Sequence, residues 1–310
     1  MNIVHIVEYK KRGPLWKLVS GLTVFDNHFV LETKERYIDL CNYDSDAFYV
    51  IHTSGKNFPM ISSLKQLLSQ GIKCAVFIHT LPDYIIDKGF STFLTYIYEV
   101  QQESNCKILV PSTKASEMFG FYRIHTDVVN LGIPPVTCKS DKPELKQYCN
   151  KIVTVSTKDT DKYKYAKGID RFSHLINDMG LEKKALILGN NSGTVDNVLN
   201  LRLSHEDFLY VLAHSKAYVQ LSRSESYNIS VIEAKQLKLP VLVSDVAGHC
   251  DSVPNSYCRV DSIEDAKRKL EEILKQETKV KHSIIENYKQ SIEHESIQAF
   301  RNRLENVILR

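Results

Sequence analysis

The sequence predicts an α/β protein made of two Rossmann-like domains that face each other across a cleft. Three observations predict this class. The chain has 310 residues, whereas a domain usually contains roughly 100–200. Short apolar runs alternate with longer mixed segments along most of the chain. A polar segment with prolines, 134–143, interrupts this alternation near the middle and is a predicted interdomain linker.

The predicted strands of the first half are nearly continuous in apolar residues, as expected for strands buried on both faces of a parallel sheet. They are Ile3–Val7, Phe48–Ile51, Cys74–Ile78, Lys107–Val110 and Asp127–Leu131. Helices are predicted between them, over 15–22, 61–69, 91–103 and 113–119. Strand and helix in regular order indicate a βαβ-wound sheet.

The alternation resumes after the linker. Strands are predicted at 152–155, 185–188, 217–221 and 241–243, and helices begin near 169, 204 and 228. Ser204 followed by Asp207 resembles a capping box and marks one helix start. The tail from 263 to 310 is predicted to be helical almost throughout. We therefore divide the chain into an N-terminal domain, 1–145, a C-terminal domain, 146–290, and a last segment, 291–310, that packs back on the N-terminal domain.

The composition excludes several classes of function. The formal net charge is only +3, which argues against nucleic acid as the main partner. The seven cysteines form no CxxC pair, which argues against a disulfide framework and a structural metal site. No signal peptide and no apolar run of roughly 18 residues are apparent, so we expect a cytoplasmic protein.

One stretch, 217–253, carries the most chemical information. It reads as strand, polar loop, helix and strand, with the loop at the carboxyl edge of a sheet. The backbone amides of Tyr227, Asn228 and Ile229 would lie at the helix N-terminus, where they can bind an anion. Glu225 lies in the loop and Glu233 lies in the helix. Without further context, Glu233 could simply stabilise the helix dipole.

The full stretch resembles the donor-site signature of the retaining GT-B glycosyltransferases of family 4. The matching positions are Ser222, Glu225, Glu233, Ala234, Pro240, Val241 and Gly248. The commonest spelling in that family has glycine where this chain has Ser226.

Other landmarks of that family occur in the expected order. Lys167 and Gly168 resemble the step that opens the first helix of the donor domain, and Gly189 resembles the residue that ends its next strand. His79 follows a predicted strand where the family often has a histidine facing the transferred sugar. Gly13 lies in the usual glycine-containing loop, which here has one glycine instead of two. The family's arginine before the lysine-glycine step is missing, and Lys158 is the best substitute.

The resemblance implies retaining sugar transfer from a nucleotide diphosphate sugar, with a UDP-sugar favoured, no metal and no cofactor. Glu225 and His79 would act on the transferred sugar. The remaining candidates would bind the donor: Lys167, Lys158, Gly13, Gly189, Ser222, Tyr227, Asn228, Ile229 and Glu233. We expect a glycan or lipid-linked acceptor. The basic loop at 10–12 is a candidate contact for an anionic acceptor or the inner face of the membrane.

Several alternatives remain open from the sequence. His79 could be a hydrogen-bonded histidine of the core, and Lys158 a solvated loop lysine. The chain could be a non-catalytic partner subunit that keeps the fold, since the arginine and one glycine are missing. It could also be a sugar-nucleotide epimerase, which would need acids in the same place.

Overall fold

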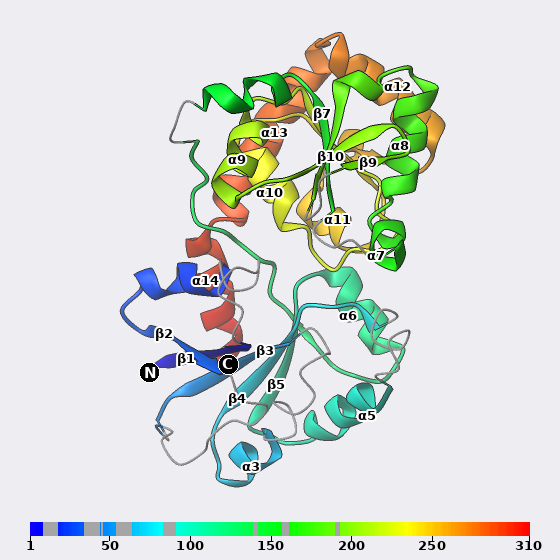
Figure 1. Ribbon diagram of the computed structural model, residues 1–310. Coiled ribbons are helices and arrows are strands. Elements are labelled where there is room, and N and C mark those ends of the chain that lie inside the picture. Colours follow the sequence, from blue (N-terminus) through cyan, green and yellow to red (C-terminus); the bar gives the residue numbers. More distant parts are fainter. Residues whose placement is uncertain are drawn as a thin grey trace. The chain divides into compact units, whose positions relative to one another are not determined.

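The computed structural model describes residues 1–8, 18–33, 44, 46–53, 64–82, 91–138, 142–156, 161–189 and 193–310. Gly13, Lys158 and the basic loop at 10–12 lie outside the described residues. The chain packs as two compact units (Figure 1). The first combines Met1–Pro134 with Glu295–Arg310, and the second is Pro135–His294.

The first unit is built on a six-stranded parallel sheet in the order β2-β1-β3-β4-β5-β6. Its strands are β1 (Ile3–Glu8), β2 (His28–Thr33), β3 (Phe48–Thr53), β4 (Cys74–Ile78), β5 (Cys106–Val110) and β6 (Asp127–Val128). Its helices include α3 (Leu64–Ser69), α5 (Ser91–Val100), α6 (Thr113–Gly120) and the terminal α14 (Ile297–Ile308). The short helix η1 (Gly21–Val24) precedes β2.

The second unit is built on a seven-stranded sheet in the order β13-β12-β11-β7-β8-β10-β9, and only β9 runs antiparallel to its neighbour. Its strands are β7 (Ile152–Ser156), β8 (Ala185–Gly189), β9 (Gly193–Val195), β10 (Val198–Arg202), β11 (Ala217–Gln220), β12 (Val241–Ser244) and β13 (Arg259–Val260). The chain builds outward from β7 on one side and then returns to build β11 to β13 on the other. The point between β7 and β11 is therefore the topological switch point, where open α/β sheets bind ligands.

Helices cover both faces of the second sheet (Figure 1). One face packs against α8 (Ile169–Asp178) and α12 (Ile263–Leu274), and the other packs against α9 (His205–Ala213) and α10 (Ile229–Gln236). Alternate strand residues supply the two cores: Ile152 and Ile187 face the first pair of helices, whereas Val153 and Leu188 face the second. This two-sided burial explains why the strands are continuous apolar runs.

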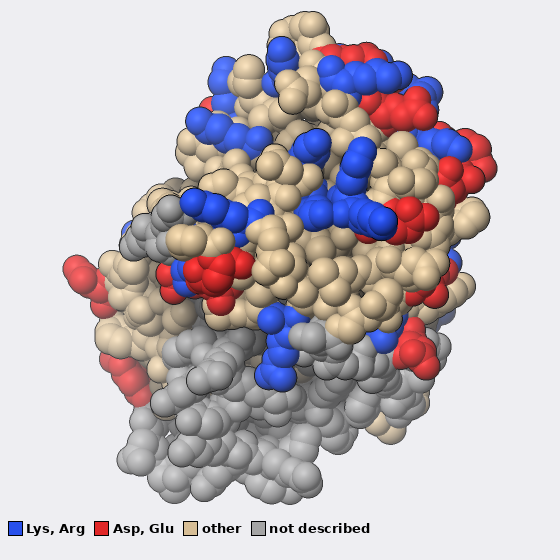
Figure 2. All heavy atoms as spheres, turned by 45° about the horizontal axis from the view of Figure 1, so that its top comes forward, with Lys and Arg blue, Asp and Glu red and all other residues tan. Residues whose placement is uncertain are grey.

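The remaining helices of the second unit are α7 (Asp161–Ala166), α11 (Ala247–Ser252), α13 (Thr278–His294) and the short η3 (Pro143–Tyr148), η4 (Glu182–Lys184) and η5 (Ser256–Cys258). On the face shown in Figure 2, basic and acidic side chains lie next to one another. The helices of the second unit carry ion pairs such as Lys267–Asp178 and Arg268–Glu272. Among the described residues, no helix has the length and apolar character needed to span a bilayer.

Most of the predicted elements are confirmed. Cys74–Ile78 is a strand with the predicted bounds, and the hydroxyl of Ser204 accepts from the amide of Asp207 as the capping pattern predicted. The predicted strand 127–131 is wrong in length, since pairing ends at Val128. The elements that were not predicted include β2, α7, β9, β10, α11 and β13.

Candidate functional site

A cluster of candidate residues lies at the switch point of the second sheet. Gly168 begins α8 with φ +65°, a left-handed conformation that favours glycine. A Cβ added to Gly168 would lie 1.8 Å from the carbonyl oxygen of Leu221, which follows β11. The side-chain amide of Gln220 donates to the carbonyl of Lys167 at 2.7 Å. The loops that follow β7 and β11 are therefore held against each other, and only glycine fits at this contact.

This contact brings Lys167 to Glu225. The ammonium of Lys167 donates to Oε1 of Glu225 at 2.5 Å, and the hydroxyl of Ser222 donates to the same oxygen at 2.9 Å. The Glu225 side chain is 4 % exposed and the Lys167 side chain 18 %. Burial alone would lower the pKa of Lys167, but the adjacent carboxylate outweighs it and raises that pKa. Lys167 is therefore a fixed positive charge at the carboxyl edge of the sheet.

Asn228 connects this pair to the start of α10. Its side-chain oxygen caps the helix by accepting from the amide of Val231 at 3.4 Å, and its side-chain nitrogen lies 3.5 Å from Glu225 Oε1. Nε2 of the buried His249 lies 3.2 Å from the same nitrogen. Burial lowers the pKa of His249, so the neutral ring accepts from Asn228 and donates from Nδ1 to the carbonyl of Ser244. Tyr227 is buried, and Ile229 is the first residue of α10.

Glu233 lies further along α10 and is buried. Its Oε1 lies 2.7 Å from Nε2 of His205, the first residue of α9. This contact holds the carboxylate of Glu233 between α10 and the start of α9. His205 was not predicted as a site residue. In the sequence, only its position next to the predicted cap Ser204 pointed to His205. Its contact with Glu233 could not be predicted from a local pattern, because the two residues are 28 positions apart.

Gly248 supports the loop from the other side. Its amide donates to the carbonyl of Glu225 at 2.9 Å. A Cβ on Gly248 would lie 2.3 Å from the carbonyl oxygen of Ser226. The loop is thus packed against α11, and Ser226 occupies the position where the resembling family commonly has glycine.

Arg223 is an arginine of this site that the sequence analysis missed. Its guanidinium pairs with both carboxylate oxygens of Asp170, at 2.7 and 2.6 Å, and lies 3.8 Å from the ring centroid of Tyr165. Its amide donates to the carbonyl of Ala166 at 2.8 Å. A local pattern before Lys167 does not reveal this arginine, because Arg223 follows β11 and not β7.

The structure thus brings together Lys167, Ser222, Glu225 and Asn228, with Glu233 on the helix that Asn228 begins.

Gly189 ends β8, where an added Cβ would lie 2.8 Å from the carbonyl oxygen of Ser156 in β7. Among the described residues, no group of three or more His, Cys, Asp or Glu side chains is arranged to hold a metal ion.

His79 belongs to the first unit and directly follows β4. Its Nε2 lies 2.9 Å from Nδ1 of His52. Burial lowers the pKa of His79 to about 3, so the ring is neutral at physiological pH. A neutral ring donates from one nitrogen and accepts at the other.

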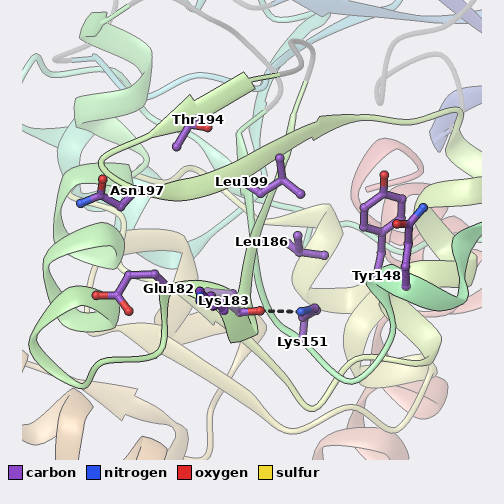
Figure 3. Close-up of a pocket in the computed structure, with 10 residues that line it drawn as sticks. Tyr148, Lys151, Glu182, Lys183, Leu186, Thr194, Asn197 and Leu199 are labelled. Carbon is purple, nitrogen blue, oxygen red and sulfur yellow. Dashed lines mark hydrogen bonds between the residues drawn. The ribbon is translucent and has the colours of Figure 1, made fainter.

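A separate hollow of about 340 Å³ lies at the opposite, amino edge of the second sheet (Figure 3). Lys151, at the start of β7, lines it and donates to the carbonyl of Lys183 at 2.5 Å. Leu186 and Leu199 line it from β8 and β10. None of the predicted site residues lines this hollow.

Residues 167–291 match the family described as Glycosyl transferases group 1. This segment contains every described site residue of the second unit. A search of curated proteins found no match.

Solved structures show the fold. An α,α-trehalose-phosphate synthase (UDP-forming) from Burkholderia vietnamiensis has a TM-score of 0.72 at 9 % identity, covering 100 % of both chains. A trehalose-6-phosphate structure from E. coli bound with UDP-2-fluoro glucose has a TM-score of 0.73 at 11 % identity, covering 99 % of both chains. The synthase (UDP-forming) from Burkholderia xenovorans in complex with glucose-6-phosphate has a TM-score of 0.66 at 11 % identity, covering 86 % of this chain and 74 % of that one.

The chain therefore has the GT-B fold that the sequence predicted. Together with the match over 167–291, this fold supports a GT-B glycosyltransferase. Assignment to family 4 in particular does not follow from these matches.

Proposed function

We propose that this protein transfers a hexosyl group from a UDP-sugar to a glycan or lipid-linked acceptor, with retention of anomeric configuration. The observation that carries the proposal is the convergence of Lys167, Glu225 and the start of α10 at the switch point of the second sheet. A positive side chain, a helix N-terminus and buried carboxylates are what a nucleotide diphosphate sugar requires.

The diphosphate would bind between Lys167 and the first amides of α10, at Ile229 and Ser230. These amides have no carbonyl partner within the helix, and the helix dipole favours negative charge there. As the bond to the sugar breaks, negative charge grows on the leaving phosphate, and these groups would stabilise it. This arrangement supplies the positive charge without a metal, so we propose metal-independent transfer.

The carboxylates would bind hydroxyl groups. Glu233, held by His205, would accept the two hydroxyls of the ribose, and Glu225 would accept hydroxyls of the transferred sugar. Gly189 would lie near the nucleoside. We further propose that Lys158 and Gly13 contact the diphosphate region and that His79 contacts the transferred sugar.

The choice of UDP is supported by two of the similar structures, one described as UDP-forming and one bound with UDP-2-fluoro glucose. Another was solved with glucose-6-phosphate, so sugar phosphates belong in any acceptor panel. We propose a cytoplasmic protein that binds an anionic acceptor or the inner face of the membrane through its basic loop at 10–12.

A thermal-shift panel of UDP-, GDP- and ADP-sugars tests the donor, since a ligand that binds only the folded state raises its stability. We expect a UDP-sugar to give the largest shift and to be hydrolysed slowly to UDP and free sugar. Binding without any release of UDP, in the presence of acceptors, would favour the non-catalytic partner. Conversion of the donor to an epimeric nucleotide sugar would favour the epimerase. No shift with any nucleotide sugar would contradict the proposal.

A further inference from the structure

The helix α13 of the second unit buries mainly polar side chains and exposes isoleucines. It packs along α10 and is labelled in Figure 1. Its buried residues recur every three or four positions, so they lie on one side of the helix: Val280, Ser283, Asn287 and Ser291. On the opposite side, Ile285 is 52 % exposed and Ile292 is 43 % exposed. A helix that only covers a core places its apolar residues inward, so this arrangement is the reverse of the usual one.

The polar groups on the inward side of α13 are already paired. The hydroxyl of Ser283 donates to the carbonyl of Val280 at 2.8 Å, and the hydroxyl of Ser291 donates to the carbonyl of Tyr288 at 2.7 Å. The side-chain amide of Asn287 donates to Sγ of Cys258 at 3.3 Å. The inward side therefore needs no further partner, and the part of α13 that the fold leaves unexplained is its outward side.

Lysines alternate with the isoleucines on that outward side. Residues at these spacings lie along one face of a helix: Lys281, Ile285, Lys289 and Ile292. We call these four residues the outer face of α13. Both lysines are exposed. Within the part of the chain that the structure describes, neither forms an ion pair, whereas Lys279, to one side, pairs with Glu272 at 2.7 Å. The outer face is therefore both apolar and positively charged.

A third lysine borders the outer face. The ammonium of the exposed Lys238 lies 4.6 Å from the ring centroid of Tyr288. Tyr288 is three positions after Ile285 and four before Ile292, so its ring is next to both isoleucines on the helix surface. Tyrosine combines an apolar ring with a polar hydroxyl, a combination that suits a boundary between water and an apolar phase.

The acidic residues of α13 lie to the other side of the outer face. Glu286 and Glu293 each follow an isoleucine and are turned about 100° from it around the helix axis. Glu286 accepts from the side-chain amide of Asn255 at 2.6 Å, which directs it away from the lysines and toward the neighbouring loop. The charge along the line of the two isoleucines is therefore positive only.

We propose that the outer face of α13 docks on an anionic lipid bilayer. The two isoleucines would enter the interfacial region of the bilayer, and the lysines between them would contact lipid phosphates. A lysine can lay its alkyl stem along apolar surface while its ammonium reaches the head groups, so alternating lysine and isoleucine fit this boundary. This surface is separate from the basic loop at 10–12, and the proposal does not depend on sugar transfer.

Charge argues against a second copy of the chain as the occupant. A symmetric contact presents the same surface from both copies. Because the outer face contains lysines and no acid, such a contact would bring like charges together without a counter-charge. A bilayer with anionic lipids supplies phosphates around every lysine, and its apolar interior accepts both isoleucines.

Sedimentation with lipid vesicles tests the proposal on the whole chain, without any nucleotide sugar. We expect binding to vesicles of equal parts phosphatidylcholine and phosphatidylglycerol, and much weaker binding to phosphatidylcholine alone. Lys281→Gln combined with Lys289→Gln should weaken binding about 25-fold, since each lysine near an anionic surface contributes about fivefold. Lys183→Gln combined with Lys184→Gln removes two exposed lysines elsewhere in the same unit and should have a much smaller effect.

The isoleucines are tested in the same assay. Ile285→Ser combined with Ile292→Ser should weaken binding about tenfold, because less apolar surface leaves water. Ile285→Leu combined with Ile292→Leu should bind like the parent. All four positions of the outer face are exposed, so these variants should unfold at the same urea concentration as the parent.

Three outcomes would overturn the proposal. The parent could bind no anionic vesicles, or the variant with both lysines replaced could bind them like the parent. The third outcome is a concentration-dependent dimer in lipid-free buffer that disappears when both isoleucines are replaced by serine. That result would assign the outer face to a second copy of the chain.

A further variant separates this surface from the basic loop. With Lys10, Lys11 and Arg12 all replaced by glutamine, vesicle binding through α13 should persist, and loss of Lys281 and Lys289 should weaken it further. If the loop variant abolishes binding and the outer-face variants bind like the parent, the membrane contact belongs to the loop alone. If α13 binds vesicles as expected and no sugar transfer is found, the α13 proposal stands and the proposed function fails.

Discussion

The ammonium of Lys167 lies 2.5 Å from Oε1 of Glu225, although 58 positions separate them in the sequence. Lys167 ends the turn before α8, and Glu225 lies in the loop after β11. The pair therefore exists only because β7 and β11 are neighbours in the sheet. In the proposed function, Lys167 binds the diphosphate and also holds Glu225, which binds the transferred sugar.

Lys167→Ala should weaken binding of UDP by roughly 1.5–3 kcal/mol and leave binding of uridine nearly unchanged. The reason is that a charge-assisted hydrogen bond to phosphate is lost, whereas the nucleoside carries no phosphate. Calorimetric titration with both ligands measures the difference. Lys164→Ala, in the preceding helix, is the matched control and should bind both like the parent. Equal losses for UDP and uridine would contradict the assignment of Lys167.

Glu233→Ala should weaken binding of both UDP and uridine, because both carry the ribose. The loss should be on the order of 1–3 kcal/mol. His205→Ala should give a smaller loss in the same direction, since it removes only the residue that fixes the carboxylate. Glu206→Ala, an exposed neighbour, serves as the control. If Glu233→Ala binds uridine like the parent, Glu233 does not contact the ribose.

Gly168→Ala should destabilise the protein by about 2–5 kcal/mol. Part of this loss comes from placing a side chain at positive φ, and part from the backbone shift needed to relieve a contact of 1.8 Å with Leu221. Gly180→Ala is a close control, since Gly180 has φ +63° and no atom within 4 Å of its added Cβ. It should lose only roughly 1–2 kcal/mol. Equal losses in urea unfolding would show that the contact with β11 is unimportant.

Transfer activity should persist after treatment with EDTA, since Lys167 and the start of α10 supply the positive charge near the leaving phosphate. The measurement is the initial rate of UDP release with and without chelator. Abolition by EDTA and recovery with Mg²⁺ or Mn²⁺ would show that a metal takes part.

The folded protein should lose stability as the pH falls below about 6.5. Burial lowers the pKa of His5 to about 3 and holds that of His52 well below 6.5, whereas the unfolded chain has ordinary values. Between these values the unfolded state binds more protons, so the free energy of unfolding decreases as the pH falls.

Each such ring contributes up to about 1.4 kcal/mol per pH unit. Urea unfolding between pH 7 and 5 measures the slope. His5→Phe should make it shallower, whereas His282→Ala, at an exposed position, should not. An identical slope in His5→Phe and the parent would show that His5 is not held neutral.

Local patterns allowed much of the second unit to be predicted from the sequence. The continuous apolar runs at 152–155 and 185–188 predicted strands buried on both faces, and the structure has them. The lysine-glycine step and Asn228 predicted helix starts, which are confirmed at α8 and α10. By contrast, β2 was not predicted: it is an edge strand with Phe29 and Leu31 exposed, so it lacks that pattern.

The boundaries of the two units depend on packing and not on local composition. The linker predicted at 134–143 begins where the structure changes units, after Pro134, and η3, which starts at the last residue of this segment, packs with the second unit. The last helix joins the first unit from Glu295 onward, through contacts such as the amide of Ile297 with the carbonyl of Ile133.

The sequence by itself determined the fold class, most strands and the identity of the residues at the candidate donor site, because periodicity, capping and short motifs are local. Only the tertiary structure decided which of these residues touch. The pairing of Arg223 with Asp170, of Glu233 with His205, and of His28 with Glu305 joins distant segments. Such contacts depend on strand order and register, which a local pattern does not encode. One residue of slip in register would turn His5 to the opposite face of the sheet and break its hydrogen bonds to His52 and His28 on the neighbouring strands.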